Sequence, residues 1–339
     1  MKKYNVAILG ATGAVGQEML KVLAERNFPI NELRLLASSR SAGKTMKFKD
    51  QDIAISEATK DSFEGMDIVL GAAENDIAKE LLPYAVKAGA VVVDNSSAYR
   101  LDENVPLVIP EVNPEDIFKH NGIIANPNCA TIIALVAINK LHEYAKIKSM
   151  VVSTYQAVSG AGNPGIAELN EQVRQVLANE ETTPKCFPYQ IAFNLIPQIG
   201  GFDELGYSSE EMKMQNEGRK ILHNPDLKVT CTCIRIPVFR SHSESITLTF
   251  ENEIDVEKAR ELLANAEGVK LMDDPKNKIY PMPLDTTDQD LVYVGRIRKD
   301  LTNDEGKALT LWCCGDQVRK GAATNAVQIA IKYIEGLES

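Results

Sequence analysis

The sequence is poor in the residues on which several classes of protein depend. Its 339 residues include one tryptophan, four histidines and six cysteines, and no two cysteines have the Cys-x-x-Cys spacing of a zinc site. So few cysteines in so long a chain argue against a disulfide scaffold and favour a reducing compartment, so we expect a cytoplasmic protein. The same scarcity leads us to expect no metal centre.

Basic charge and long apolar runs are also scarce. There are 37 basic against 47 acidic residues, a formal net charge of −10, which argues against nucleic acid or a membrane surface as a partner. The longest apolar stretch, residues 129–138, is far shorter than the roughly 20 residues of a membrane helix. The first residues resemble a strand rather than a signal peptide, because their apolar run is broken at Gly10. The remaining composition, 44% hydrophobic and 25% charged, is globular, and the length predicts two domains.

The first part of the chain alternates short β-branched runs with amphipathic segments, the pattern of a parallel sheet wrapped by helices. We expect helices over residues 14–26 and 76–87. The expected strands cover residues 5–9, 33–37, 67–71, 90–94 and 106–109. This arrangement predicts an α/β domain of the doubly wound, Rossmann type.

The second part of the chain has a different character. Residues 131–144 form a helix that is apolar on most sides. Strand-like runs then follow one another with few helices between them, at residues 148–155, 228–237, 245–251, 290–298 and 308–314. We therefore predict an α+β domain on a mixed or antiparallel sheet. The last helix, 322–335, has no strand partner of its own, and we expect it to pack on the first domain. The predicted domains are 1–128, completed by 319–339, and 129–318.

A glycine-rich turn lies directly after the first predicted strand. It reads Gly10-Ala11-Thr12-Gly13-Ala14-Val15-Gly16 and opens the first helix. Glycines let the backbone turn sharply and approach a pyrophosphate, which the free N–H groups of the helix stabilise. A tight turn without a ligand is the alternative, but the position at the start of a βαβ unit favours a dinucleotide site.

The end of the second predicted strand bears on the choice of dinucleotide. An NAD site usually has an acidic residue there, but this sequence has Ser38-Ser39-Arg40-Ser41. Hydroxyls and a guanidinium suit a 2′-phosphate. NADP is the predicted cofactor, although Arg40 does not exclude NAD, and an exposed polar loop is the structural alternative.

One cysteine has the setting of a nucleophile. Cys129 directly precedes the apolar helix, so the helix N-terminus would stabilise its thiolate. Of the histidines, His242 lies in a turn between two strands, seven residues after Arg235, whereas the other three lie near helix ends or turns, where solvated or capping roles are usual. We predict that Cys129 and His242 form a catalytic pair beside a nicotinamide cofactor, which suggests acyl-thioester chemistry. The other five cysteines are expected to pack structurally: Cys186, Cys231, Cys233, Cys313 and Cys314.

These residues resemble one enzyme family from end to end, the aspartate-β-semialdehyde dehydrogenases. Two positions depart from the pattern: Ala130 stands where a serine often follows the cysteine, and Cys313-Cys314-Gly315 replaces an apolar pair and serine. The motifs that carry the resemblance are GATGAVG (10–16), SSRSAGK (38–44), DNSSAYR (94–100), NPNCAT (126–131), YQAVSGAG (155–162), IAFNLIPQIG (191–200), EEMK (210–213), RIPVFRSHSES (235–245) and RKGAATNAVQIA (319–330).

The resemblance implies a role for each matching residue. Cys129 would be the nucleophile, His242 its acid/base partner, and Gln156 would orient the acyl intermediate. The substrate-binding residues would be Arg235 for the α-carboxylate, Glu210 for the α-amino group, and Arg100 and Lys213 for the phosphate. Asn128 would also bind the substrate. The residues that would bind NADP are Gly10, Thr12, Gly13, Ala14, Val15, Gly16, Ser38, Arg40, Ser41, Ser159, Gly160 and Gln317.

Enzymes of this family reduce L-aspartyl-4-phosphate to L-aspartate 4-semialdehyde, on the route to lysine (through diaminopimelate), methionine and threonine. The resemblance implies this reaction for the present protein. It also implies a homodimer, with a tetramer as the alternative. An N-acetyl-glutamyl-phosphate reductase shares the plan and the cysteine mechanism, but Glu210 together with Arg235 argues against an acetylated substrate. A catalytically inactive homologue would have lost Cys129 or His242, and both are present.

Overall fold

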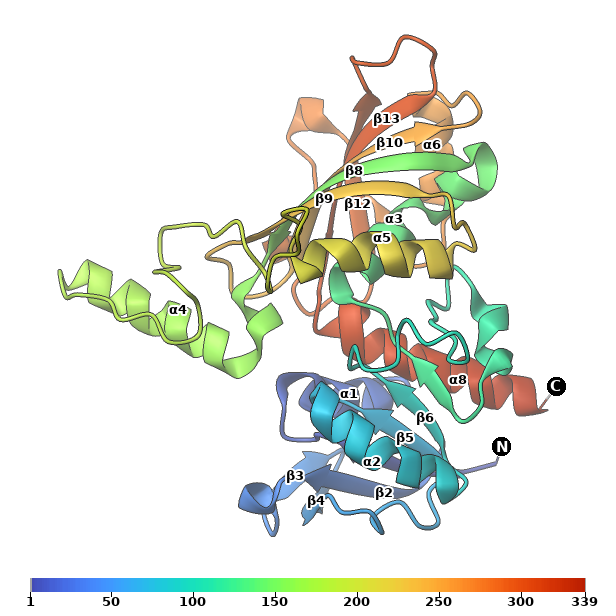
Figure 1. Cartoon of the computed structure of the whole chain (residues 1–339), viewed down its shortest axis with the longest axis vertical. Coiled ribbons are helices and arrows are strands. Elements are labelled where there is room, and N and C mark those ends of the chain that lie inside the picture. The colour runs from blue at the N-terminus through green and yellow to red at the C-terminus, as the bar shows by residue number, and fades with distance from the viewer. Residues whose placement is uncertain (1, 339) are drawn as a thin grey trace. The chain divides into compact units, whose positions relative to one another are not determined.

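The computed structural model describes residues 2–338, which form two compact units. The first unit comprises Met1–Asn128 together with Ala322–Ser339, and the second comprises Cys129–Gly321. Each unit has its own sheet (Figure 1).

The first unit is built on a seven-stranded sheet in the order β3-β4-β2-β1-β5-β6-β7. Its neighbouring strands are parallel except for the antiparallel pair β3 and β4. The strands are β1 (Tyr4–Leu9), β2 (Ile30–Ala37), β3 (Thr45–Phe48), β4 (Gln51–Glu57), β5 (Ile68–Gly71), β6 (Val91–Asp94) and β7 (Ile123–Ala125). Short 3-10 helices, η1 (Ser39–Ser41) and η2 (Pro114–Lys119), lie in its connections.

Helices cover both faces of this sheet. Alternate strand residues such as Val6 and Ile8 pack with α1 (Ala14–Glu25) and α8 (Thr324–Glu338), whereas Ala7 and Leu9 pack with α2 (Asn75–Lys87). Because successive strand residues point to opposite faces, both sides of β1 must be apolar. This confirms the predicted doubly wound fold, with the C-terminal helix in the core of the first unit.

Some predicted elements of the first unit are wrong in detail. Residues 106–109 form no strand: Leu107 makes an isolated bridge with Ala125, and the edge strand is β7. Prolines at positions 106 and 110 remove backbone donors at both ends of that segment, which limits its pairing. The antiparallel hairpin of β3 and β4 was not predicted, and its burial pattern is largely exposed.

The second unit is built on a six-stranded mixed sheet in the order β11-β12-β13-β10-β8-β9. The pairs β8–β9 and β11–β12 are parallel and the other pairs are antiparallel, in agreement with the predicted mixed sheet. The strands are β8 (Ile147–Gln156), β9 (Lys228–Arg235), β10 (His242–Phe250), β11 (Val269–Leu271), β12 (Val292–Lys299) and β13 (Ala308–Gly315).

The helices α3 (Cys129–Ala145), α5 (Ser209–Ile221) and α6 (Val256–Ala264) pack against this sheet. As predicted, α3 is buried on most sides, since its Ala, Ile and Leu residues leave almost no polar face. The helix α4 (Gly162–Leu177) extends away from the sheet in Figure 1 and, like α5, was not predicted. The remaining elements are η3 (Val158–Ala161), η4 (Pro275–Asn277), α7 (Pro283–Thr286) and the π-helical turn η5 (Arg319–Ala323).

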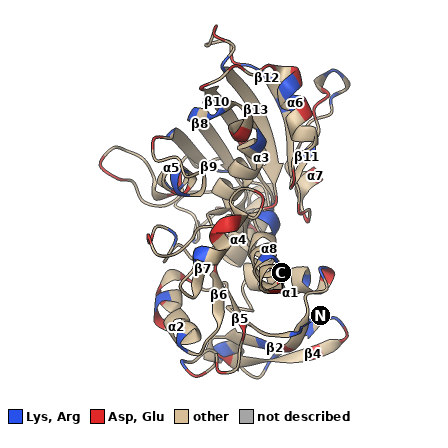
Figure 2. Ribbon diagram, turned by 90° about the vertical axis from the view of Figure 1, so that its right-hand side faces the viewer, with Lys and Arg blue, Asp and Glu red and all other residues tan. Residues whose placement is uncertain are grey.

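Acidic and basic residues are interspersed along the helices and strands of both units (Figure 2). Among residues 2–338, no helix combines the length and apolarity required to cross a membrane.

Candidate active site

Topology brings the predicted catalytic residues of the second unit to one edge of its sheet. Gln156 and Arg235 are the last residues of the parallel strands β8 and β9 and are paired in register. His242 is the first residue of β10, which runs antiparallel to β8, so it begins where β8 ends. Strand ends far apart in the sequence are thereby gathered at a single edge.

Cys129 and His242 lie within contact distance, as expected for a nucleophile and its partner. The Cys129 Sγ is 3.5 Å from the His242 Nε2. Cys129 is also the first residue of α3, where the positive end of the helix dipole favours a negative charge. The pair therefore combines a helix N-terminus with a ring nitrogen, the setting in which a thiolate is stabilised.

The His242 ring is fixed by a backbone donor. The Ala157 N–H donates to the His242 Nδ1 at 3.1 Å, and the ring is completely buried. An acceptor at Nδ1 places the proton of the neutral ring on Nε2, facing Cys129. Burial, and next the positive charge of Arg235, lower the pKa of His242 to about 3. The ring therefore stays neutral near pH 7 and presents an N–H to the sulfur.

Arg235 lies beside the same ring. Its Nη1 donates to the Ala157 carbonyl oxygen at 2.5 Å, and its Cζ lies 5.8 Å from the centre of the Phe187 ring. A Cβ at Gly160 would lie 2.6 Å from the Arg235 Nη1 and 3.4 Å from the His242 Cε1. Gly160, which the resemblance assigned to NADP, thus leaves the space that the guanidinium occupies.

Glu210 and Lys213 lie on one face of α5 and form a salt bridge of 2.8 Å. The Gln156 Nε2 donates to the other Glu210 oxygen at 3.3 Å. The helix begins with a capping box, in which the Ser208 hydroxyl accepts from the Glu211 N–H and the Glu211 carboxylate accepts from the Ser208 N–H. The sequence Ser-x-x-Glu is the signal that could have identified α5.

Gln317 and Ser159 are joined by a hydrogen bond from the Gln317 Nε2 to the Ser159 Oγ. The Gln317 Oε1 accepts from the Ser241 N–H at 2.8 Å, so the Gln317 amide is engaged at both ends. Ser241 directly precedes His242 and is completely buried with a φ of 80°. No motif in the sequence marks this conformation of Ser241.

The glycine turn of the first unit has the shape that a dinucleotide requires. A Cβ at Gly16 would lie 2.3 Å from the Gly10 carbonyl oxygen, and Gly10 has a φ of 85°. Gly13 is the N-cap of α1 and supplies no side-chain acceptor, and the first turn of α1 contains no acidic residue. Since the terminal N–H groups have no side-chain cap, the turn fits a bound pyrophosphate.

The other predicted cofactor residues of the first unit flank this turn. Ala14 and Val15 begin α1, and the Thr12 carbonyl oxygen accepts from the Gln17 side chain. After β2, Ser38 occupies the N-cap position of η1 without a side-chain cap hydrogen bond, and η1 contains Arg40 and Ser41. Arg40 is exposed, and among the described residues it has no hydrogen bond or ion pair.

Two predicted substrate residues also belong to the first unit. Arg100 is buried, and its Nε and Nη2 donate to the carbonyl oxygens of Asn126 and Asn95 at 2.9 and 2.7 Å. Asn128 is buried and directly precedes Cys129 in the chain.

The remaining cysteines divide into two groups. Cys231, Cys233, Cys313 and Cys314 are buried, as the packing interpretation requires. Burial and then neighbouring groups raise the pKa of Cys313 well above its usual value, and burial raises that of Cys314 to about 12. For Cys186 the packing interpretation is wrong: this residue is exposed, because the segment after α4 runs along the surface.

Two further residues that support the site, Glu168 and Gly321, could not be predicted from the sequence, because they are defined by close contacts in the fold and not by a motif. The Glu168 carboxylate accepts from the N–H groups of Lys185, Cys186 and Phe187, which fixes the ring that faces Arg235. A Cβ at Gly321 would lie 2.8 Å from the Cys129 Cβ.

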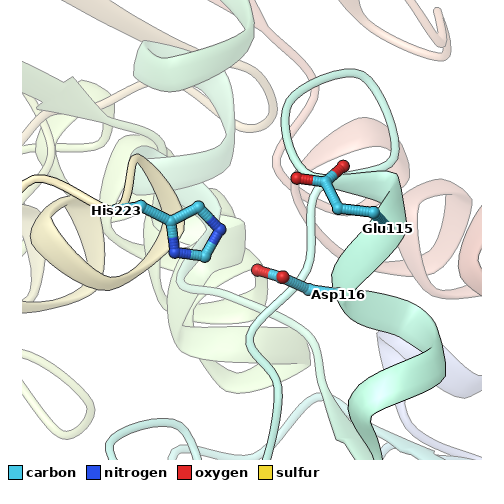
Figure 3. Close-up of side chains that lie close together, drawn as sticks. All are labelled: Glu115, Asp116 and His223. Carbon is cyan, nitrogen blue, oxygen red and sulfur yellow. The ribbon is translucent and has the colours of Figure 1, made fainter.

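Three potential metal ligands are drawn in Figure 3: Glu115, Asp116 and His223. Glu115 and Asp116 belong to the first unit and His223 to the second. Asp116 is already engaged by Asn113 and Lys119. We therefore assign no metal site to these residues.

Comparison with known proteins defines the class first. Residues 5–120 match the family described as semialdehyde dehydrogenase, NAD binding domain, and residues 138–320 match its dimerisation domain. The chain is thus an oxidoreductase with an NAD(P)-binding domain and a domain of the type through which these enzymes associate.

Individual relatives narrow this class. The chain is 54% identical to the aspartate-semialdehyde dehydrogenase of Aquifex aeolicus, covering 98% of this chain and 99% of that protein. It is 50% identical to the enzyme of Bacillus subtilis, with 96% of both chains covered. The crystal structure of aspartate semialdehyde dehydrogenase II from Vibrio cholerae, complexed with ASA, matches with a TM-score of 0.96 at 43% identity over 99% of each chain. A Candida albicans enzyme with NADP matches with a TM-score of 0.76 at 27% identity over 98% of each chain. The chain belongs to the aspartate-semialdehyde dehydrogenase family.

Proposed function

We propose that the protein reduces L-aspartyl-4-phosphate to L-aspartate 4-semialdehyde, with NADPH as reductant and release of phosphate, through a thioester on Cys129. The observation that carries the proposal is the Cys129 Sγ at the N-terminus of α3, 3.5 Å from the His242 Nε2. Membership of the aspartate-semialdehyde dehydrogenase family supports the substrate.

Cys129 forms the covalent bond in this scheme. Its thiolate attacks the acyl carbon, the bond to the phosphate oxygen breaks, and inorganic phosphate leaves. When bound, the dinucleotide supplies a hydride to the thioester carbon. The sulfur then leaves again as a thiolate, so Cys129 is regenerated without a net change.

His242 and Gln156 act on the oxygen at the reacting carbon. The Nε2–H of His242 faces the sulfur. In this scheme it donates to the oxygen on the carbon that is bonded to that sulfur. A donor positioned in advance stabilises the oxyanion that forms when the thiolate or hydride adds. The ring is neutral near pH 7 and carries its proton on Nε2, so His242, the acid/base partner in this scheme, acts on that oxygen through its Nε2–H. The Gln156 amide, at the end of β8, orients the acyl group.

The charged residues select the substrate. We assign Arg235 to the α-carboxylate, because it is a buried cation beside His242. Glu210 takes the α-amino group, and this role requires a free amine, which an N-acetylated substrate lacks. Lys213 and Arg100 take the phosphate, and Asn128 completes the substrate-binding set.

NADP is the proposed dinucleotide, bound by the glycine turn and the η1 segment. The exposed guanidinium of Arg40 favours a 2′-phosphate over a 2′-hydroxyl. In the second unit, Ser159, Gly160 and Gln317 complete the proposed set of cofactor residues. We further propose a homodimer rather than a tetramer, a cytoplasmic location consistent with six free thiols, and a role in lysine, threonine and methionine biosynthesis.

The direct test follows absorbance at 340 nm in the oxidative direction. The purified protein should form NADPH from aspartate semialdehyde, NADP and phosphate, with a rate that depends on phosphate. NAD in place of NADP tests the cofactor, and N-acetyl-glutamate semialdehyde tests the substrate. A rate independent of phosphate would count against acyl-phosphate chemistry.

Variants of two cysteines test the nucleophile. Cys129→Ala should lower kcat by at least about 10⁴-fold, because no thioester can form. Cys186→Ala is the matched control, since it removes an exposed thiol from the same unit. Retention of turnover by Cys129→Ala would refute the assignment.

A further inference from the structure

The residue before His242 has an unfavourable backbone conformation. Ser241 has a φ of 80° and is completely buried. Only glycine adopts positive φ freely, because any Cβ there crowds the following carbonyl oxygen. Such a conformation persists only where neighbouring groups hold it, and it is common at functional sites. The chain must turn at Ser241 for His242 to begin β10 at the active-site edge.

Two buried side chains hold Ser241 in this conformation. The Ser241 N–H donates to the Gln317 Oε1 at 2.8 Å, and the Ser241 hydroxyl shares a hydrogen bond with the Thr286 hydroxyl. Gln317 is 3% exposed and Thr286 is completely buried. Gln317 follows β13 and Thr286 ends α7, so the turn is fixed from two further elements.

Gln317 also joins this turn to the segment that fixes the imidazole. Its Nε2 donates to the Ser159 Oγ, two residues after Ala157, whose N–H binds the His242 Nδ1. Backbone hydrogen bonds from Val158 to Val238 (2.9 Å) and from Ser159 to Phe239 (3.3 Å) join the same two segments. One amide thus connects the turn that carries His242 to the turn that orients its ring.

We propose that Gln317, through Ser241, is a positioning residue that aims the His242 Nε2–H at Cys129. This inference rests on the proposed function for the roles of those two residues. It assigns Gln317 a task distinct from the cofactor contact that the family resemblance implies. The two roles differ in what a variant should change: the affinity for NADP in one case, and the reactivity of Cys129 in the other.

Gln317→Leu removes both hydrogen bonds while keeping a similar side-chain volume. We expect kcat at saturating NADP to fall about tenfold or more, because a misaimed donor stabilises the oxyanion less. Loss of an NADP contact alone would raise the KM for NADP and leave this saturated rate unchanged. Without its acceptor, the Ser241 turn relaxes and the Nε2–H moves away from the sulfur. Thr286→Val, which removes a single hydroxyl, should change kcat in the same direction by a smaller factor.

The substitution Ser241→Gly distinguishes a positioning role of Gln317 from a contact with the cofactor. Glycine adopts a φ of 80° without the Cβ penalty, so adding Ser241→Gly to Gln317→Leu should restore part of kcat. Lys146→Gly is the matched control, because Lys146 is an exposed residue with a φ of 59° just after α3. The combination of Gln317→Leu with Lys146→Gly should gain stability without recovering kcat.

A second measurement requires no turnover. In a Cys186→Ser background, the rate of Cys129 alkylation by iodoacetamide is recorded against pH. The Nε2–H stabilises the thiolate, so Gln317→Leu should shift the midpoint of this profile to higher pH, and Ser241→Gly should shift it back. This readout remains valid even if the wild-type protein does not turn over aspartate semialdehyde.

Three results would overturn the proposal. The first is a raised KM for NADP with kcat and the alkylation profile unchanged, which indicates a cofactor contact alone. The second is equal recovery of kcat with Lys146→Gly and Ser241→Gly. The third is no recovery with Ser241→Gly in a variant whose circular dichroism spectrum matches that of the wild type.

Discussion

At the scale of single residues, Gly160 shows how an absent side chain shapes a site. A methyl group there would lie 2.6 Å from the Arg235 Nη1, closer than such contacts allow. Gly160→Ala should therefore displace the guanidinium and raise the KM for aspartate semialdehyde about tenfold, the effect of losing about 1.4 kcal/mol of binding. Initial rates with varied aspartate semialdehyde and varied NADP measure the two KM values separately.

The control for this substitution is Gly201→Ala. A Cβ at Gly201 meets nothing within 4 Å, and its φ is not positive. That variant should leave both KM values unchanged. If Gly160→Ala raises only the KM for NADP, Gly160 contacts the cofactor and its role is not to leave space for the Arg235 guanidinium.

Glu244 is a buried carboxyl whose two oxygens have no hydrogen-bond partner in the described chain. Burial, and next the neighbouring Cys233, raise its pKa well above 4.5. Above pH 4.5 the folded protein therefore keeps a proton that the unfolded chain releases. Folding then binds more protons, and this carboxyl makes stability fall by about 1.4 kcal/mol per pH unit until the folded-state pKa is reached.

Glu244→Gln removes that titration. Its gain in thermal midpoint over wild type should be several degrees larger at pH 8 than at pH 5, as measured by scanning calorimetry. The exposed Glu251 provides the control Glu251→Gln, which should show no such difference. An identical pH dependence in Glu244→Gln and wild type would mean that Glu244 is ionised in the folded state.

Residues with a motif could be predicted, and residues defined by proximity could not. Cys129 and His242 were identified from a helix start and an elimination among four histidines, and the structure places them 3.5 Å apart. Ser241 has no distinctive chemistry, and its importance lies in a φ of 80° that depends on Gln317, 76 residues away. A backbone conformation imposed by distant partners leaves no periodic signal in a single sequence.

At the scale of elements, the N-terminus of α1 allows a test of anion binding. The first turn of α1 contains no acidic residue, although acidic residues there usually stabilise a helix. Ala14→Asp should leave thermal stability unchanged or raise it, while increasing the KM for NADP about tenfold through repulsion of the phosphates. Ala14→Asn, with the same shape and no charge, should have a much smaller effect. Equal KM values for Asp and Asn would show that the phosphates bind elsewhere.

Elements rich in apolar residues were predicted, and the more polar helices α4, α5 and α6 were missed although α4 and α6 are amphipathic. The apolar α3 and the buried β1 follow from their residues alone. The helix α5 has a low apolar content and is recognisable mainly by the capping box of Ser208 and Glu211. Residues 106–109 read as a strand because they are apolar, but they are buried by packing and not by pairing with a full neighbour.

At the scale of the whole molecule, the net negative charge of each chain opposes the association of two chains into a homodimer. Each chain carries a formal charge of −10, so two copies repel, and salt screens that repulsion within a Debye length of about 10 Å at 0.1 M. If the protein is a homodimer, sedimentation should give twice the 37.2 kDa chain mass, and the dissociation constant should fall as NaCl rises from about 0.02 to 0.5 M. Sedimentation of a labelled sample at nanomolar concentration measures both quantities. A mass of four chains would show that the protein is a tetramer and not a dimer. Weaker association at high salt would show that attractive ion pairs dominate the interface.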